Sequence, residues 1–342
     1  MTDTLRILDA NLNRAREGVR ACEEFARLVL EDARVSTLLK DIRRNLQAIS
    51  TGVGENLLLA ARDVANDAGA RPQGDANRRS GPEDMARAGI KRAQEALRVI
   101  EETLYAQAPE LAPEAASARY RAYEAEQQLF VAAPLRRVLQ ESPVMVVFSR
   151  ALCRRPWRDV ADSLIEAGAR LFQVREKDAG DRALIGIFIE LSARLQGTGA
   201  VIVNDRADLA RAAQADGVHV GQDDLPCGDA RRVVGHARLV GVSTHNPAEA
   251  RTAEAEGADY IGLGAVFPTA TKDVQYHATP ELIRATLEAV KLPVFAIGGI
   301  TPANVVQLGA MGVRHAAVSA GLLDTEDPAG AYHALAEALR KG

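Results

Sequence analysis

The first 140 residues carry their apolar side chains at the spacing of helices. Apolar residues recur at alternating steps of four and three in two separate runs. The first run is Leu8, Leu12, Ala15, Val19, Cys22, Ala26 and Val29, and the second is Ala86, Ile90, Ala93, Leu97, Ile100 and Leu104. Such a stripe buries one face of a helix against neighbouring helices. The pattern therefore predicts two long amphipathic helices in this half of the chain.

The two runs also share their charged positions. The sequence Arg14-Ala15-x-Glu17-x-x-Arg20-x-x-Glu23-Glu24 recurs as Arg92-Ala93-x-Glu95-x-x-Arg98-x-x-Glu101-Glu102. Each copy is followed by a second predicted helix, at 34–50 and 114–140, and a segment rich in Gly, Pro and Asn separates the copies. A duplicated helical hairpin predicts a four-helix bundle.

The repeated charges allow two interpretations. Arg and Glu side chains three or four positions apart pair along a solvated helix face, which adds only about 0.2–0.5 kcal/mol per pair. The same charges also fit a polar site between the repeats, with Arg62, Asp63 and Asp67 as further members. Intrahelical pairing is the simpler interpretation, and we favour it.

After Pro143 the pattern changes to short β-rich runs that alternate with amphipathic helices. Eight strand–helix units in about 200 residues fit a compact TIM (β/α)8 barrel, and a doubly wound parallel sheet is the structural alternative. We therefore expect an all-α domain at 1–140 and an α/β barrel at 141–342. The predicted strands are Val144–Phe148, Leu171–Val174, Val201–Val203, Val218–Val220, Leu239–Val242, Tyr260–Leu263, Val294–Ile297 and Ala316–Val318.

Polar and glycine-rich segments follow nearly every predicted strand. In a (β/α)8 barrel all strand ends open onto one face, and that face holds the active site. The segments are Gln173-Val-Arg175-Glu176-Lys177, Asn204-Asp205-Arg206, Gly221-Gln222-Asp223-Asp224, Ser243-Thr244-His245, Pro268-Thr269-Ala-Thr271-Lys272, Gly298-Gly299-Ile300 and Ser319-Ala320-Gly321. Segments that are far apart in the chain are thus predicted to converge on one cup.

This set of side chains predicts a metal-assisted reaction of phosphorylated substrates. Asp205 and Asp224 follow adjacent strands and suit one Mg²⁺, which takes few protein carboxylates and completes its shell with water and phosphate. Arg175, Lys177 and Lys272 supply positive charge. The Thr-x-Thr-Lys loop offers donors to one phosphate, and the glycines after strands seven and eight leave room for a second.

Each element also has a simpler interpretation. An Asp after a strand is often a helix cap, Arg175 or Lys177 alone fits a surface ion pair, and Gly298-Gly299 alone fits a tight turn. The six histidines lack metal-ligand spacing and are interpreted as ordinary polar residues. Only the joint pattern favours an active site.

Composition and charge narrow the function further. A formal charge of -4 gives no reason to expect a nucleic-acid partner. No stretch approaches the ~18 apolar residues of a membrane span, and the N-terminus lacks the apolar core of a signal peptide. Cys22, Cys153 and Cys227 fit neither a disulfide framework nor a zinc site. We expect a cytoplasmic protein whose cysteines are small buried hydrophobes.

Seven motifs, in order, then resemble those of a known family. They are QVREK, VNDRADLA, DGVHVGQDDLP, GVSTH, YIGLGAVFPTATK, AIGGI and AVSAG. On these motifs residues 144–340 resemble thiamine phosphate synthase, whose fold is a TIM barrel. The resemblance implies a Mg²⁺-assisted condensation of 4-amino-2-methyl-5-hydroxymethylpyrimidine diphosphate with hydroxyethylthiazole phosphate. Diphosphate leaves, and the thiazole nitrogen attacks the pyrimidine cation.

The same resemblance implies a role for each site residue. Asp205 and Asp224 hold Mg²⁺, and the predicted catalytic cations are Lys177, Arg175 and Lys272. The pyrimidine diphosphate is faced by Gln173, Arg175, Lys177, Asn204 and Ser243, while Thr269, Thr271 and Lys272 close over the thiazole phosphate and the diphosphate. The thiazole phosphate is cradled by Gly299, Ser319 and Ala320.

Two departures from the family pattern leave questions open. Ser149 and Arg150 follow the first strand, where relatives read nearer to YLVTD, so the contribution of this loop is undetermined. Residues 1–140 look like an extension found in some fused relatives, with a dimerisation or docking role, or a second activity, as alternatives. A thiazole tautomerase of the same fold and a non-catalytic sensor of thiamine precursors are the rival functions. Neither rival needs the complete set of Lys177, Asp205 and Asp224.

Overall fold

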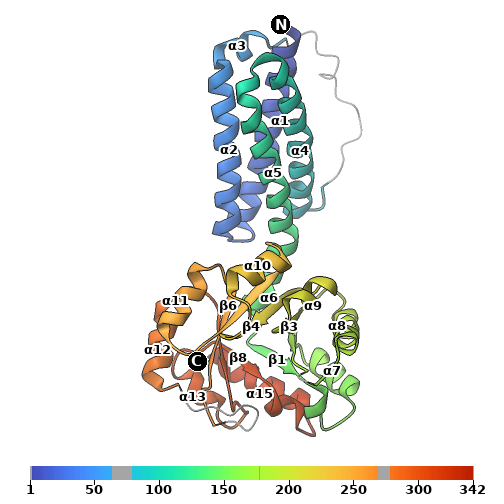
Figure 1. Ribbon diagram of the computed structural model, residues 1–342, viewed down its shortest axis with the longest axis vertical. Helices are drawn as coiled ribbons and strands as arrows, with labels where there is room; N and C mark the ends of the chain where they lie inside the picture. Colours follow the sequence, from blue (N-terminus) through green and yellow to red (C-terminus); the bar gives the residue numbers. More distant parts are fainter. Residues whose placement is uncertain (1, 64–78, 177, 269–277, 342) are drawn as a thin grey trace. The chain divides into compact units, whose positions relative to one another are not determined.

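The computed structural model describes residues 2–63, 79–176, 178–268 and 278–341 of the 342-residue chain (Figure 1). The chain divides into two compact units, Met1–Ala133 and Pro134–Gly342, each with its own apolar core.

The first unit is all-α, and the predicted helical bundle is confirmed. Its four long helices lie side by side in Figure 1. Asp32 caps one of them by accepting the backbone N–H groups of Arg34 and Val35. The helices are α1 (Thr2–Leu28), α2 (Ala33–Val53), α4 (Pro82–Gln107) and α5 (Ala112–Gln127), with the short α3 (Glu55–Ala60) and η1 (Pro109–Leu111) between them.

The predicted stripes form the core of this bundle. Every residue of both stripes is buried except Val29, which is 43% exposed because α1 ends at Leu28. The two stripe-bearing helices approach each other at glycines. A Cβ added to Gly18 would lie 2.3 Å from the carbonyl oxygen of Gly89, and one added to Gly89 would lie 2.8 Å from that of Gly18. Small residues thus let α1 and α4 pack backbone to backbone.

Part of the repeated charge pattern pairs along each helix. Arg20 contacts Glu24 at 2.8 Å in α1, and Arg98 contacts Glu102 at 2.5 Å in α4. Both pairs have i,i+4 spacing and exposed side chains. For these positions the simpler intrahelical interpretation holds.

A second repeated glutamate, Glu23 in α1 and Glu101 in α4, is buried and pairs between helices. Glu23 accepts a hydrogen bond from Arg43 of α2 at 2.6 Å, and Glu101 accepts one from Arg119 of α5 at 2.7 Å. Each bond links one hairpin's first helix to its second. Intrahelical pairing is therefore the wrong interpretation for Glu23, and for Glu101 it accounts only for a further contact with Arg98.

The residues proposed to extend a polar site lie near the start of α1. Arg62 donates two hydrogen bonds of 2.8 Å to the Asp9 carboxylate, and Arg6 bonds the backbone oxygen of Asp63 at 2.9 Å. Asp67 lies outside the described residues. These contacts link α1 to the segment after α3 and leave the Glu23 and Glu101 pairs separate.

The second unit is a closed parallel barrel, so the predicted TIM barrel is confirmed. Strand β1 pairs with β8, with Val144 opposite Ala316, and this closure rules out the doubly wound sheet. The strands are β1 (Val144–Phe148), β2 (Leu171–Val174), β3 (Ala200–Asn204), β4 (Gly217–Val220), β5 (Leu239–Thr244), β6 (Tyr260–Gly264), β7 (Val294–Ile297) and β8 (His315–Val318).

Helices cover the outside of this barrel (Figure 1). Several begin at the sequence signals expected of helix starts: Asn246 caps α11 and Thr279 caps α12, each followed by Pro. The helices are α7 (Trp157–Glu166), α8 (Asp181–Leu195), α9 (Ala207–Ala212), α10 (Cys227–Val234), α11 (Pro247–Ala255), α12 (Pro280–Ala289), α13 (Val305–Gly309), α14 (Ala320–Leu323) and α15 (Pro328–Lys341), with the 3₁₀ turn η3 (Arg150–Leu152).

Side chains along each strand alternate between two apolar clusters. Val144, Val146 and Phe148 of β1 pack with the surrounding helices, whereas Met145 and Val147 belong to the cluster inside the barrel. Because side chains of a strand alternate with a period of two, the parity of a position decides whether it faces the lumen. The same rule shows which polar residues of the strands face the lumen.

A helix closes the barrel at the end where the strands begin. In α6 (Ala133–Glu141), which follows the π-turn η2 (Gln128–Ala132), Leu135 and Leu139 pack into the inner cluster. The chain after the helix is tied down by a 2.9 Å hydrogen bond between the Ser142 backbone oxygen and His315 Nδ1. The predicted domain boundary at residue 140 falls near the end of this helix.

The described cysteines are free, with Cys22 and Cys227 buried and Cys153 half-buried. Burial raises the pKa of the Cys22 thiol to about 12 and that of Cys227 to about 11. Within the described ranges, no helix is both long and apolar enough to cross a membrane.

Candidate active site

Three predicted site residues face the lumen near the carboxyl ends of their strands. Gln173 shares the parity of Leu171, Asn204 that of Ile202, and Ser243 that of Leu239, and these three apolar residues belong to the inner cluster. Gln173 is buried, while Asn204 and Ser243 are half-buried at the rim. The barrel thus brings side chains of β2, β3 and β5 to one cup.

Below Ser243, two unpredicted polar residues form a hydrogen-bonded chain. His219 of β4 contacts Ser243 Oγ through Nε2 and Tyr260 Oη through Nδ1, each at 3.0 Å. Burial lowers the pKa of His219 to about 4 and raises that of Tyr260 far above its ordinary value of 10. The His219 imidazole is therefore neutral at physiological pH.

Asp205 lies directly after β3 in a strained backbone conformation. Its φ is +64°, a region that non-glycine residues seldom adopt. Its backbone N–H donates to the His219 carbonyl at 2.7 Å, and the Arg206 N–H donates back to the Asn204 carbonyl at 2.8 Å. This tight turn exposes the Asp205 side chain at the rim. Strain of this kind is common at functional sites.

Asp224 lies in the loop after β4, on the neighbouring strand. Its Oδ2 accepts a 2.7 Å hydrogen bond from the Gly221 backbone N–H. Its negative charge also acts on His219, where it opposes the effect of burial on the imidazole pKa. Both predicted carboxylates therefore border the carboxyl end of β4. Across the described residues, no group of three or more His, Cys, Asp or Glu side chains is placed to bind a metal.

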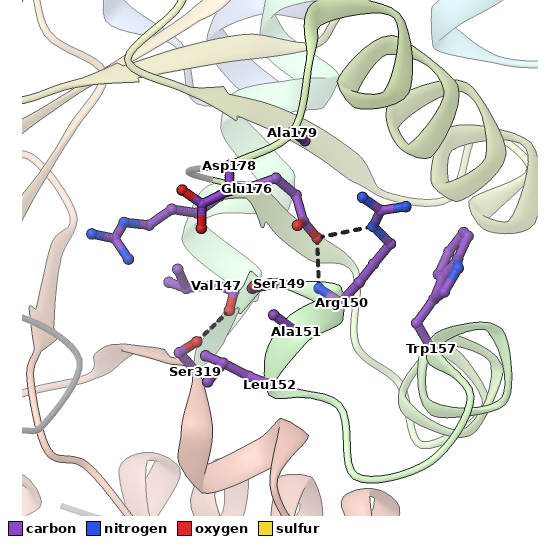
Figure 2. A pocket seen from close by; sticks show the side chains of 11 residues that line it. Val147, Ser149, Arg150, Ala151, Leu152, Trp157, Glu176, Asp178, Ala179 and Ser319 are labelled. Carbon is purple, nitrogen blue, oxygen red and sulfur yellow. Dashed lines mark hydrogen bonds and ion pairs between the residues drawn. The ribbon is translucent and has the colours of Figure 1, made fainter.

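A cavity of about 620 Å³ opens at the ends of β1, β2 and β8 (Figure 2). Two predicted site residues, Arg175 and Ser319, belong to its lining, together with Ser149 and Arg150 of the unusual first loop. The Arg175 backbone N–H donates to the Phe148 carbonyl at 2.9 Å, so the loop after β2 continues the pairing with β1. The cavity is part of the same rim.

Arg150 holds a buried carboxylate in this cavity. Glu176 Oε1 accepts hydrogen bonds from the Arg150 backbone N–H at 2.5 Å and from its Nε at 3.4 Å (Figure 2). The Glu176 side chain is only 8% exposed. The atypical end of the first strand therefore has a definite structural role: it anchors Glu176, the residue that follows Arg175 in the loop after β2.

The loop after β7 passes close to the loop after β6. Gly299 has φ of +62°, and a Cβ there would lie 2.2 Å from the Pro268 carbonyl oxygen. Asn304 donates to the Gly299 carbonyl at 2.8 Å and accepts from the Thr301 N–H at 2.8 Å. This loop needs glycine for both its conformation and its close approach.

The loop after β8 lies against the loop after β7. Ser319 Oγ donates to the Val147 carbonyl at 2.7 Å (Figure 2). Ala320 is exposed at the start of the four-residue helix α14, and a Cβ on Gly321 would lie 2.5 Å from the Ile300 carbonyl oxygen. Paired loops after strands seven and eight, followed by a short extra helix, are typical of the phosphate site of TIM barrels.

Four predicted site residues lie outside the described residues: Lys177, Thr269, Thr271 and Lys272. Sequence reasoning also missed side chains that the structure brings into the site. Of these, His219 carried a signal, because it lies at an inward parity position of β4. Glu176, Arg150 and Asn304 gave none, since their roles depend on contacts between separate loops.

Two family models match the chain. The model described as Thiamine monophosphate synthase matches residues 144–322, which is the barrel, and the ThiD2 family model matches residues 6–128 of the helical unit. The two matches thus fall in different units of the structure.

Curated relatives match over nearly the whole chain. A thiamine-phosphate synthase of Gloeobacter violaceus is 40% identical and covers 99% of this chain and 97% of its own length. One from Prochlorococcus marinus is 37% identical and covers 98% and 96%, so both relatives include the helical extension. The solved thiamine phosphate pyrophosphorylase of Pyrococcus furiosus is 33% identical, with a TM-score of 0.54, and covers 60% of this chain and 98% of its own.

Proposed function

The chain belongs to the thiamine-phosphate synthase family, and we propose which residues at the rim of its barrel bind each of the two substrates. The enzyme is a transferase that condenses 4-amino-2-methyl-5-hydroxymethylpyrimidine diphosphate with hydroxyethylthiazole phosphate, giving thiamine phosphate and diphosphate. The observation that carries the proposal is the convergence on one rim of Gln173, Asn204 and Ser243 with the carboxylates of Asp205 and Asp224.

The pyrimidine diphosphate occupies the side of the cup formed by β2, β3 and β5. Asn204 and Ser243 offer hydrogen-bonding groups at the rim, and Gln173 lies deeper in the lumen. Arg175 lines the adjoining cavity, and we assign its positive charge to the diphosphate. Lys177, two positions later in the same loop, is assigned to the diphosphate itself.

Asp205 and Asp224 fit a Mg²⁺ ion by the chemistry of their donor atoms. Two exposed carboxylates at adjacent strand ends match a cation that takes few protein ligands and retains water and phosphate oxygens. Asp224 keeps one oxygen outside its bond to Gly221. When bound, the ion would supply positive charge to neutralise the diphosphate leaving group.

The thiazole phosphate occupies the paired loops after β7 and β8. Gly299 leaves the space that a Cβ would fill, Asn304 fixes its carbonyl, and Ser319 and Ala320 begin the turn into α14. In this proposal the thiazole lies on the side of the cup opposite β3 and β4. Thr269, Thr271 and Lys272 are assigned to the loop that closes over both substrates and excludes water.

The reaction needs stabilised charge more than a protein nucleophile. The C–O bond to diphosphate breaks, the aminopyrimidine stabilises the carbon cation, and the thiazole nitrogen donates its electron pair to that carbon. Lys177, Arg175 and Lys272 stabilise the negative charge that develops on diphosphate. The neutral buried His219 is consistent with this chemistry, since no strong base is required.

Steady-state kinetics of Lys177→Ala test this assignment. We expect turnover to fall by roughly 100-fold, the loss typical of removing one group that stabilises transition-state charge. The KM for thiazole phosphate should change far less. Normal turnover would remove Lys177 from the proposed role. Thiazole isomerisation without release of diphosphate would contradict the proposed assignment of both substrates to the rim.

For the helical unit, we propose self-association. Several large apolar side chains on its surface are more than half exposed, namely Leu57 (59%), Leu59 (60%), Tyr105 (58%) and Tyr120 (64%). Leu57 and Leu59 share the short helix α3, and apolar side chains that gather on a surface favour contact between proteins. Sedimentation of the full chain and of a Leu57→Lys, Leu59→Lys variant tests the proposal. A multimer that the variant dissociates supports it, and a monomeric wild-type chain contradicts it.

A further inference from the structure

We propose that His219 and Tyr260 are positioning residues that set the direction of the Ser243 hydroxyl, so that Ser243 donates its proton to the bound pyrimidine diphosphate. The proposal rests on the assignment of Ser243 to that substrate. It adds that the donor role of Ser243 is dictated from inside the barrel, by a chain of hydrogen bonds that crosses from β6 through β4 to β5.

The chain is closely spaced and shielded from water. Tyr260 Oη lies 3.0 Å from His219 Nδ1, and His219 Nε2 lies 3.0 Å from Ser243 Oγ. Tyr260 is fully buried and His219 is 7% exposed. Tyr260 also packs edge-on against Phe295, with ring centroids 5.5 Å apart. Both rings are therefore held in place, and only Ser243, at the end of the chain, reaches the rim.

Two glycines make room for the rings. A Cβ on Gly241 would lie 2.0 Å from Tyr260 Cζ, and one on Gly262 would lie 3.3 Å from His219 Cε1. Both glycines stand at inward positions of β5 and β6, where other strands carry filling side chains. The lumen is therefore shaped around this hydrogen-bonded pair.

The proposal gives the protons of the chain one direction. Tyr260 donates its O–H to His219 Nδ1, 3.0 Å away. A ring nitrogen that accepts a hydrogen bond carries no proton, so the imidazole proton lies on Nε2. His219 then donates to Ser243 Oγ, also 3.0 Å away.

This arrangement leaves Ser243 one proton to give. Because its oxygen accepts from His219, its own O–H points elsewhere, and the half-buried side chain opens toward the cup. The backbone of Ser243 is also fixed, since Gln222 Nε2 donates to its carbonyl at 2.5 Å. A hydroxyl oriented in this way suits the anionic oxygens of a diphosphate, which only accept hydrogen bonds.

Kinetics of Tyr260→Phe test the proposal, because this change removes one hydroxyl and keeps the ring. We expect kcat/KM for the pyrimidine diphosphate to fall roughly tenfold, because the change should weaken the hydrogen bond from Ser243 to the charged diphosphate. The KM for thiazole phosphate should stay unchanged. Tyr332→Phe is the matched control: Tyr332 is also buried and donates one bond, to the Gly168 carbonyl at 3.1 Å, far from the rim. Equal losses in the two variants would overturn the proposal.

A double-mutant cycle separates positioning from general packing. If Tyr260 acts through Ser243, adding Tyr260→Phe to Ser243→Ala should cost no further activity. Additive losses would contradict the chain. If Ser243→Ala itself leaves the kinetics unchanged, the substrate assignment of Ser243 fails, and that outcome is distinguishable from a failure of the chain alone.

The tautomer of His219 gives a readout that does not depend on activity. In the ¹⁵N NMR spectrum of the full chain at pH 7.5, His219 should show the Nε2–H tautomer, and Tyr260→Phe should shift it toward a mixture. The His219→Gln spectrum identifies the signal. A wild-type Nδ1–H tautomer would overturn the proposed direction.

Discussion

Glu23 of α1 and Glu101 of α4 occupy matching positions of the internal duplication, and both are buried and bonded to an arginine of the next long helix. The partners are not at matching distances along the chain: Arg43 comes 20 residues after its glutamate and Arg119 comes 18 residues after. The segments between the paired helices, 29–32 and 108–111, match in length, so the duplication has kept the pairing although the arginine lies at a different position of the second helix in each copy.

This relationship predicts an acid-sensitive bundle. The hydrogen bond from Arg119 holds the Glu101 pKa below its ordinary value of 4.5. A carboxyl whose pKa is lower in the folded chain adds stability above its unfolded pKa, and that stability is lost as the pH falls through the folded value. We therefore expect the α4 and α5 amides to lose protection from hydrogen exchange below about pH 4.5, after correction for intrinsic rates.

Glu101→Gln should weaken this pH dependence and cost about 1–3 kcal/mol at neutral pH, because it removes a charged hydrogen bond in a buried position. Glu102→Gln is the matched control, since Glu102 is exposed in an i,i+4 pair. An unaltered pH profile in Glu101→Gln would show that another group causes the acid sensitivity.

The contact between Gly18 and Gly89 predicts that Gly18→Ala destabilises the bundle. The added Cβ would meet a backbone carbonyl at 2.3 Å, so the helices must separate, at a cost of about 1–3 kcal/mol. Gly186→Ala in α8 is the control, because a Cβ there meets nothing within 4 Å and alanine is the better helix former. Urea unfolding measures both variants. Equal stability of the two would contradict the close crossing.

The ion pair between Arg150 and Glu176 predicts an effect on substrate binding. Arg150→Ala removes the side-chain contact at 3.4 Å and loosens the loop that carries Arg175 and Lys177. We expect the KM for pyrimidine diphosphate to rise about three- to tenfold, equivalent to ~0.7–1.4 kcal/mol. Arg154→Ala, which breaks an exposed pair with Glu326, should leave the kinetics unchanged. A wild-type KM in Arg150→Ala would make the pair dispensable for binding.

The carboxylates at the ends of β3 and β4 predict a shared dependence on Mg²⁺. Asp205→Asn and Asp224→Asn should each raise the Mg²⁺ concentration needed for half-maximal activity, by roughly tenfold or more, because each removes one anionic ligand. Asp223→Asn, in the same exposed loop as Asp224, is the control. Activity of both variants at the wild-type Mg²⁺ requirement would exclude these carboxylates as the ligand pair.

The fold was predictable because the apolar residues of both cores recur at the spacings of helices and strands. The stripe from Leu8 to Ala26 is buried as its spacing predicted, and the alternation in strands such as Leu239–Val242 matches the barrel's two clusters. The helix boundary at Val29 was the exception, since periodicity continues past the point where α1 stops.

The site residues were predictable only where they lie at the carboxyl ends of strands. Gln173, Asn204 and Ser243 follow from position alone, because every parallel strand delivers its carboxyl end to the same rim. The burial of Glu176 depends on Arg150, which belongs to another loop, and no spacing in the sequence signals such a contact. His219 and Ser243 belong to different sequence motifs, so the motifs did not indicate that the barrel makes the two side chains neighbours.

The helix α6 has a consequence for where substrates can reach the barrel. Leu135 and Leu139 pack against the inward side chains at the end where the strands begin, so that end is filled with apolar side chains. Both substrates and both products therefore enter and leave at the opposite face, where polar residues follow the strands.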